Sequence, residues 1–197
     1  MRIKHWRVLV LVVVIGGVAA LGGFTYISNQ EHDNRFCISC HTQPESDYYA
    51  RFQSAVATQT AEDLAAFHHR KKDIACIDCH GGEGIVGRVQ VEAYAARNAI
   101  LHYTNTARQP AVILLPIQNE ACLKCHDAEM RKPGFENHFH NKQFLSQDPV
   151  PFIRCTDCHI AHRQGDEQTV FQFRTAILPK CEYCHTTVGK GPRGLSQ

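Results

Sequence analysis

The pattern Cys-x-x-Cys-His occurs five times in this chain of 197 residues and uses all ten of its cysteines. It is the attachment signature of c-type haem, in which both cysteines bind the haem covalently and the histidine binds the iron. The cysteines are Cys37 and Cys40, Cys76 and Cys79, Cys122 and Cys125, Cys155 and Cys158, and Cys181 and Cys184. The histidines that follow them are His41, His80, His126, His159 and His185. The sequence therefore predicts five covalently attached haem c groups with their iron.

The main alternative interpretation is zinc, because Cys-x-x-Cys pairs also form zinc sites. Zinc does not require His after every pair, and zinc sites would combine the pairs two by two, whereas five is odd. His makes up 13 of the 197 residues, so five such positions would all be His by chance on the order of once in a million. Disulfides explain the pattern no better, since oxidised Cys-x-x-Cys pairs suit redox enzymes. Haem is preferred, and several haems in one chain indicate electron transfer.

An uncharged run from Val8 to Ile27 has about the length that a helix needs to cross a bilayer. Three basic residues precede it: Arg2, Lys4 and Arg7. The positive-inside rule places the N-terminus in the cytoplasm and the five motifs on the extracytoplasmic, periplasmic side. A cleaved signal peptide is the alternative, but its apolar region is usually shorter. We expect a cytoplasmic tip and a single-pass membrane anchor over residues 1–30.

Residues 31–197 are expected to form one exported pentahaem domain. They provide roughly 33 residues per haem, too few to wrap each haem in an apolar domain of its own. We therefore expect a mainly α fold with long loops, little or no sheet, and the haems themselves as the core. The net charge of +2 gives no indication of binding to nucleic acid.

Two helices are expected between the motifs. Thr60-Ala-Glu-Asp63 is typical of a helix start. The segment from Val86 to His102 is predicted to form one helix whose inner stripe is Val89, Ala93, Ala96 and Ile100. The short apolar run between Pro110 and Pro116 is interpreted as a buried, strand-like loop; contact with the bilayer or a membrane partner is the alternative.

Each haem iron has a second axial position, and two His ligands give a lower potential than His with Met. The methionines are Met1 and Met130, and Met1 lies on the cytoplasmic side, so at most one haem is His/Met. The candidate second ligands are the other extracytoplasmic histidines: His32, His68, His69, His102, His138, His140 and His162.

The spacing along the chain separates some of these candidates. His162 follows His159 by three residues and cannot reach the far face of the same haem, so it is expected to bind a neighbouring haem. We prefer His69 over His68, although His68 lies on the apolar face of its helix. His138 and His140 are equivalent by this reasoning. His32 is the candidate second ligand of the haem nearest the membrane. The alternative is that this haem has no second ligand or only a weak one.

The apolar start, the segment Phe36-Cys-Ile-Ser-Cys-His41 and the later Cys155-Thr-Asp-Cys-His-Ile-Ala-His162 resemble the NapC/NirT/NrfH family. Its members are membrane-anchored multihaem cytochromes that take electrons from quinol and pass them to periplasmic reductases. The resemblance implies the membrane quinol pool as donor and an extracytoplasmic redox protein as acceptor.

Three features differ from that family's pattern. Gln43 stands where members often carry Met, and a fifth motif is present where common members have four. The helix after the second motif lacks the Asp of the quinol pocket and carries Arg88, Glu92, Arg97 and Asn98 instead. The plan is also similar to the pentahaem subunit of alternative complex III, where other membrane subunits take part in quinol oxidation. The donor is therefore either quinol or a quinol-oxidising membrane subunit.

A haem-based reductase of a small substrate is the second class of function. Multihaem nitrite reductases replace one motif His with Lys at the catalytic haem, whereas all five motifs here end in His. An electron-transfer subunit is thus preferred over a stand-alone catalyst.

Overall fold

The computed structural model describes residues 2–40, 42–132, 154–188 and 194. Within these ranges the regular elements are helices and no strand is formed, as the sequence predicts. An isolated antiparallel bridge joins His159 and Gln172. The helices are α1 (Arg2–Gln30), α2 (Asn34–Cys40), α3 (Glu45–Thr58), α4 (Leu64–Lys72), α5 (Cys76–His80), α6 (Gly84–Tyr103), α7 (Asn119–His126), α9 (Cys155–Cys158) and α10 (Arg174–Val188), with short 3-10 turns η1 (Glu129–Arg131) and η3 (Glu167–Thr169).

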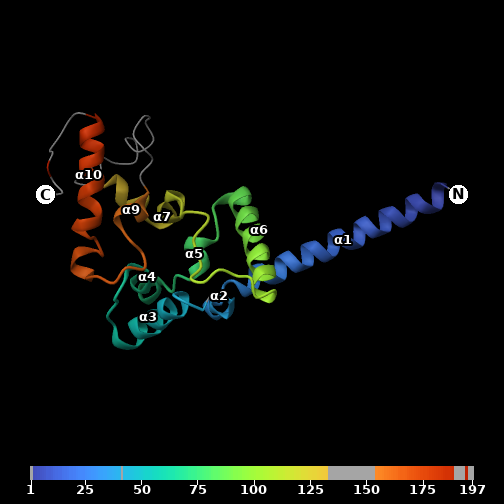
Figure 1. Ribbon diagram of the computed structural model, residues 1–197, viewed down its shortest axis with the longest axis horizontal. Helices are drawn as coiled ribbons and strands as arrows, with labels where there is room; N and C mark the ends of the chain where they lie inside the picture. The colour runs from blue at the N-terminus through green and yellow to red at the C-terminus, as the bar shows by residue number, and fades with distance from the viewer. Residues whose placement is uncertain (1, 41, 133–153, 189–193, 195–197) are drawn as a thin grey trace.

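Helix α1 projects away from the rest of the molecule (Figure 1). Its apolar side chains are exposed along its length, among them Val8, Leu11, Ile15 and Leu21. The segment His5–Gln30 is long enough and apolar enough to cross a membrane. An apolar helix whose side chains are exposed along most of its length is suited to an apolar solvent such as lipid.

The buried apolar core of the described residues is small. It consists of Phe52 and Ala55 from α3, Ala66 from α4, and Ala61 and Phe171 from the loops. Helices α3 and α4 pack closely on each other and carry most of it. A core of this size leaves most of the domain without an apolar interior of its own chain.

Helix α4 begins later than the sequence suggests. Asp63, and not Thr60, is its N-cap: Asp63 is extended and its Oδ1 accepts a hydrogen bond of 2.8 Å from the Ala66 backbone N–H. Both residue types are good N-caps. Asp63 also accepts a hydrogen bond from Arg51 of α3, which favours Asp63 over Thr60 as the N-cap. The spacing of residues within this segment does not reveal that contact.

Helix α6 confirms the expected helix from Val86 to His102, but the expected inner stripe is wrong. Val89, Ala93, Ala96 and Ile100 are exposed. The opposite face, which includes Val91, Ala95 and Asn98, lines the interior. Periodicity identifies an apolar stripe but does not say which side of the helix meets the domain. The segment between Pro110 and Pro116 forms no strand, and its Val112, Ile113 and Leu114 are about half exposed.

Candidate functional site

The cysteines of the motifs lie on helices. Those of motifs one to four lie on the short helices α2, α5, α7 and α9, and motif five lies within the longer α10. His159 of motif four follows the end of α9. In motifs two and four the third helical residue is Asp, which accepts a hydrogen bond from the backbone N–H just before the first cysteine. Asp78 accepts from Ala75 at 2.7 Å, and Asp157 accepts from Arg154 at 2.9 Å. This contact closes the first turn, so each cysteine pair begins on a fixed helix end.

Successive motif helices contact one another in chain order: α2 with α5, α5 with α7, α7 with α9, and α9 with α10. Figure 1 shows them following one another away from α1. Ion pairs support two of these contacts. Lys124 of motif three lies 2.6 Å from Glu83 after motif two, and Lys180 before motif five lies 3.1 Å from Asp157 of motif four. The five attachment sites therefore form a series.

Two asparagines join the motifs into equivalent pairs. Asn34 precedes the first cysteine of motif one by three residues, and its Oδ1 accepts a 2.8 Å hydrogen bond from the backbone N–H of Cys76 in motif two. Asn119 precedes motif three in the same way, and its Oδ1 accepts a 2.8 Å bond from the N–H of Cys155 in motif four. Both asparagines are buried. The pairs one–two and three–four thus repeat one arrangement.

The first cysteines of each pair also touch. The Cys76 thiol donates a hydrogen bond to the Cys37 sulfur, which raises the pKa of Cys76 and lowers the pKa of Cys37. The Cys122 thiol contacts Cys155 in the same sense and lowers the pKa of Cys155 to about 7. Attachment groups of neighbouring motifs therefore lie within van der Waals contact of each other.

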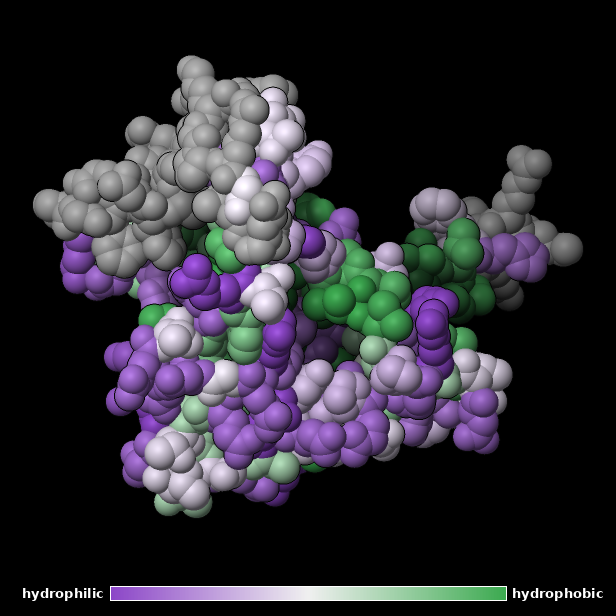
Figure 2. All heavy atoms as spheres, turned by 60° about the vertical axis from the view of Figure 1, so that its left-hand side comes forward, coloured by the Kyte–Doolittle hydropathy of each residue, from purple (hydrophilic) through white to green (hydrophobic). Residues whose placement is uncertain are grey.

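A large, mostly apolar cavity of about 1790 Å³ runs through the middle of the domain. Ordinary ligand pockets have volumes of ~300–1,000 Å³, so it exceeds what one small molecule needs. Figure 2 shows hydrophobic side chains gathered beside this hollow. Its lining includes the motif residues Cys37, Cys76, Cys79, His80, Cys122, Cys125, His126, Cys155, Cys158, His159, Cys181 and His185.

His162 faces the histidine of motif two across this cavity. The rings of His80 and His162 are parallel within 7°, and their centres are 6.2 Å apart. Two imidazoles that bind one metal from opposite sides have ring centres about 6 Å apart, because each metal–nitrogen bond is about 2 Å long. The observed separation matches that spacing. His162 therefore faces the histidine of another motif, while binding of iron by His162 stays a prediction.

Several contacts hold His162 in place. Tyr48 of α3 stacks on its ring with centres 4.0 Å apart, and Arg51 donates a 3.1 Å hydrogen bond to its carbonyl oxygen. Arg51 in turn pairs with the buried Asp63 at 2.5 Å. Burial lowers the pKa of His162 to about 4, so the ring is neutral at pH 7, which is the form that binds a metal. Its Nδ1 is buried and has no hydrogen-bond partner in the described part of the chain.

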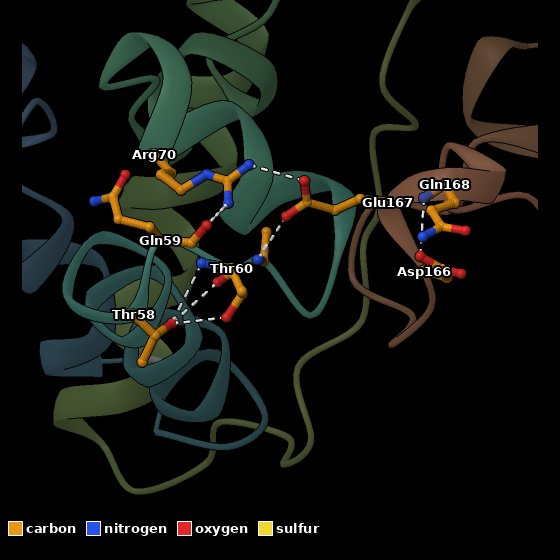
Figure 3. Close-up of polar contacts among 8 residues, drawn as sticks. Thr58, Gln59, Thr60, Arg70, Asp166, Glu167 and Gln168 are labelled. Atoms are coloured by element: carbon orange, nitrogen blue, oxygen red, sulfur yellow. Dashed lines mark hydrogen bonds and ion pairs between the residues drawn. The ribbon is translucent and has the colours of Figure 1, made fainter.

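The segment after His162 is fastened to α4 by one carboxylate. Glu167 Oε1 accepts a 2.8 Å hydrogen bond from the Ala61 N–H, and Oε2 accepts a 2.9 Å bond from Arg70 (Figure 3). Arg70 also donates to the Gln59 carbonyl oxygen. These contacts place Phe171 in the small core and hold the loop that carries His162 against α3 and α4.

His68, and not the preferred His69, lines the large cavity. The rings of His68 and His126 of motif three have centres 5.9 Å apart with planes at 88°. His68 Nδ1 contacts the Leu64 carbonyl oxygen at 2.8 Å, which leaves Nε2 for a metal. His69 stacks on Phe52 and contacts the Ile74 carbonyl oxygen, on the other side of α4. The structure thus favours His68, the reverse of the sequence preference.

The remaining candidates are dispersed. His32 and His69 line a second hollow of about 730 Å³ beside α3. His102 packs against Tyr103 and is not part of the large cavity, whereas Met130 lines it. His41, His138 and His140 lie outside the described residues, as does the side chain of Cys184. Gln43 donates a 3.0 Å hydrogen bond to Ser46 on α3.

A charged cluster lies where α1 meets α6. Arg88 of α6 pairs with Glu31, just after α1, and with Glu92 at 2.5 Å. Ser28 donates a 2.9 Å hydrogen bond to Glu92. Burial raises the pKa of Glu31, although the hydrogen bond from Arg88 opposes that rise. Glu31 also lines the large cavity near Cys37 and Cys76, so the cluster connects the end of α1 to the first motif pair.

The sequence model of the NapC/NirT cytochrome c family, N-terminal region, matches residues 1–111, which is more than half of the chain. The chain belongs to this family. It is similar to the cytochrome c-type protein NapC of Haemophilus influenzae, at 25% identity over 174 residues that cover 80% of this chain and 81% of that protein. No solved structure matches the chain. The resemblance to NapC/NirT cytochromes is therefore confirmed.

Membership in a cytochrome c family implies covalently bound haem c, and the site fits that group. The cavity is larger than a single small-molecule pocket and is lined by Cys-x-x-Cys-His residues from successive helices. A buried nitrogen of His162, Nδ1, has no hydrogen-bond partner among the residues that the structure describes. Sequence reasoning missed the side chains that hold this NapC/NirT-family site together, namely Asn34, Asn119, Tyr48, Arg51 and Glu167. The repeated Asn three residues before motifs one and three is a signal that could have been noticed.

Proposed function

We propose that this NapC/NirT-family chain is a membrane-anchored pentahaem cytochrome that relays electrons from the quinol pool to an extracytoplasmic redox protein. When bound, haem c supplies one-electron chemistry through its iron. The observation that carries the proposal is the series of five motif helices in contact, each beside the next in chain order. Such a series provides a continuous path for electrons, because each motif helix contacts the next one along the chain.

The chain divides into two parts in this proposal. Residues 1–30 form the anchor, with the N-terminus in the cytoplasm, and residues 31–197 form the haem domain on the periplasmic side. The apolar helix His5–Gln30 supports the anchor, and the basic residues Arg2, Lys4 and Arg7 support the orientation. Motif one begins at Cys37, a few residues after α1, so electrons enter there and leave near motif five.

The ten motif cysteines hold the haems, and the five motif histidines bind iron from one side. His80 and His162 would together hold one iron, and His126 and His68 another, because the rings of both pairs have the separation that two imidazole ligands of one metal need. His32, His102 and either His138 or His140 remain candidates for the other irons. Tyr48 and Arg51 hold His162 in place, and burial keeps its ring neutral by lowering its pKa.

Quinol gives up protons as well as electrons, so a direct donor needs bases near the membrane. Glu31 follows α1 and Glu92 lies on α6; Arg88 bridges the two carboxylates, and Glu31 lines the cavity near motif one. This cluster favours quinol itself as donor, although the chain has no Asp on α6. Transfer through a quinol-oxidising membrane subunit, as in alternative complex III, is the second possibility. A haem-based reductase is the remaining alternative. It is disfavoured because all five motifs end in His, whereas multihaem nitrite reductases have Lys at the catalytic haem.

The test uses the full chain purified in mild detergent. Intact-mass analysis should show five haem additions, and four or fewer on mature protein would contradict the proposal. A reduced quinol analogue should then reduce the wild type, and His41→Ala should block that reduction while dithionite still reduces the other haems. If the wild type accepts no electrons from quinol but does so when co-purified membrane subunits are present, the donor is a subunit. Normal quinol reduction of His41→Ala would place the entry point elsewhere.

A further inference from the structure

Helix α6 carries a continuous apolar stripe on its exposed side. The outer stripe consists of Val86, Val89, Ala93, Ala96, Ile100 and Tyr103, which recur every three or four residues. The exposed fractions of Val86, Val89, Ile100 and Tyr103 are 72%, 55%, 65% and 82%. Scattered exposed apolar residues are ordinary, but a stripe along one helix face indicates a surface that something covers.

Haem in the large cavity does not cover this stripe. The residues of α6 that line the cavity include Val91, Ala95 and Asn98. At 100° per residue they lie on the side of the helix opposite the outer stripe. The stripe therefore faces away from the motif helices and from any group that they hold.

The position of α6 relative to α1 indicates what lies on that side. The cluster of Arg88, Glu31, Glu92 and Ser28 fixes α6 to the end of α1. Figure 1 shows α6 running across the axis of α1, between α1 and the helices α5, α7, α9 and α10. Because the cavity side of α6 faces the motif residues across the cavity, the outer stripe faces the side on which α1 departs.

We propose that α6 lies on the periplasmic surface of the bilayer with its outer stripe among the lipid headgroups and upper acyl chains. This proposal rests on the membrane anchor of the proposed function. The chemistry of the stripe fits a lipid surface: it carries no acidic residue, it ends in the amphipathic Tyr103, and Arg97 lies beside it. Helix α6 is apolar on one face only, because Arg88, Glu92 and Arg97 lie on its other sides. One apolar face suits a helix that lies on the membrane surface, whereas a spanning helix is apolar all round.

Such a helix would fix the height of the domain above the membrane. A single helix such as α1 leaves a domain free to tilt, whereas a second contact at α6 restrains the tilt. Motif one and the Glu31 cluster would then stay at the lipid surface, where a lipid-soluble donor arrives.

The test is photocrosslinking in the full chain. Val89→p-benzoylphenylalanine places a probe on the outer stripe, and the matched control is Tyr183→p-benzoylphenylalanine on α10. The two side chains are similarly exposed, at 55% and 60%, but α10 lies at the end of the molecule away from α1 (Figure 1). Each variant is incorporated into nanodiscs, irradiated and analysed by mass spectrometry. Lipid adducts should be about tenfold more frequent at position 89 than at position 183.

Two outcomes overturn the proposal. One is an adduct at position 89 to a second copy of the chain or to another protein, and the other is no lipid adduct while α1 remains anchored. Ile100→p-benzoylphenylalanine serves as a second stripe probe if the Val89 variant lacks its normal haem content. Release of the protein from membranes by alkaline extraction would instead show that the anchor itself fails. Quinol reduction is measured separately, so failure of electron relay is distinguishable from failure of this inference.

Discussion

His80 and His162, far apart in the sequence, lie with their imidazole rings parallel within 7° and their centres 6.2 Å apart. His80 belongs to motif two, whereas His162 follows motif four by a few residues. Contact between them therefore ties the two halves of the domain together at one site. This spacing suits two ligands of one metal, so replacement of either histidine should change the spectrum of the same haem.

Replacement of His162 by Ala should open one axial position. The haem held by motif two would lose its second ligand, so the low-spin signal in electron paramagnetic resonance should fall by the share of one haem and a high-spin signal should appear. Arg163→Ala is the control, because Arg163 is exposed and its guanidinium lies over the Phe173 ring. Unchanged low-spin intensity in His162→Ala would remove His162 from the ligand set.

His68 and His69 provide a matched pair of neighbours. His68→Ala should convert one haem to high spin, since His68 faces His126 across the cavity. His69→Ala should leave the haem spectrum unchanged and lower only stability, because His69 stacks on Phe52 of the small core. Near-infrared and paramagnetic resonance spectra of both variants separate the two roles. A high-spin signal from His69→Ala alone would restore the sequence preference.

Asn34→Leu should weaken the contact between motifs one and two. It leaves the Cys76 backbone N–H without its acceptor, which costs roughly 1–3 kcal/mol. Asn34→Asp keeps an acceptor oxygen at the same place and should recover most of the loss. Thermal unfolding of the haem-loaded protein measures stability, and the reduction potentials report whether the paired haems change. Equal stability of the Leu and Asp variants would show that the hydrogen bond is unimportant.

Glu167 predicts a pH-dependent contribution to stability. Burial would raise its pKa, but the hydrogen bonds from Arg70 and the Ala61 N–H outweigh it and lower the pKa below the ordinary 4.5. The carboxylate therefore stabilises the fold fully above that ordinary value, and the contribution is lost as pH falls through the folded pKa. Glu167→Gln should lower stability by roughly 1 kcal/mol at pH 7, because the pair is partly exposed.

The measurement is thermal unfolding of wild type and Glu167→Gln from pH 7 to pH 3. The two curves should converge at the acidic end, where the wild-type carboxylate is protonated. Glu129→Gln is a control, since Glu129 pairs with Lys132 at the surface and should have a smaller effect. A constant difference across the whole range would mean that charge on Glu167 does not matter.

The family and its haem c chemistry can be predicted from the sequence because the attachment motif is local. Cys-x-x-Cys-His motifs, the apolar α1 and the helix over Val86 to His102 all follow from neighbouring residues. The mainly α-helical fold can also be predicted, since the short segments between attachment sites leave little room for a β-sheet. These features depend on spacing of a few residues, which can be read directly.

Other features depend on contacts between distant residues. The cap at Asp63 needs Arg51 from α3, and the choice of His68 over His69 depends on which side of α4 meets motif three. The inward face of α6 is set by the cavity and not by its most apolar stripe. The repeat of Asn34 and Asn119 before motifs one and three is visible in the sequence, but their partners Cys76 and Cys155 are not.

The contacts of the motif helices in chain order have a consequence for how such proteins can change in length. Motif five joins the row through α9 and α10, with Lys180 on Asp157, and it comes last along the chain. An attachment site added or lost at such an end extends or shortens the conductor without reordering the sites before it. The length of the electron path can therefore change by one motif at a time, while the contacts between the other motifs stay the same.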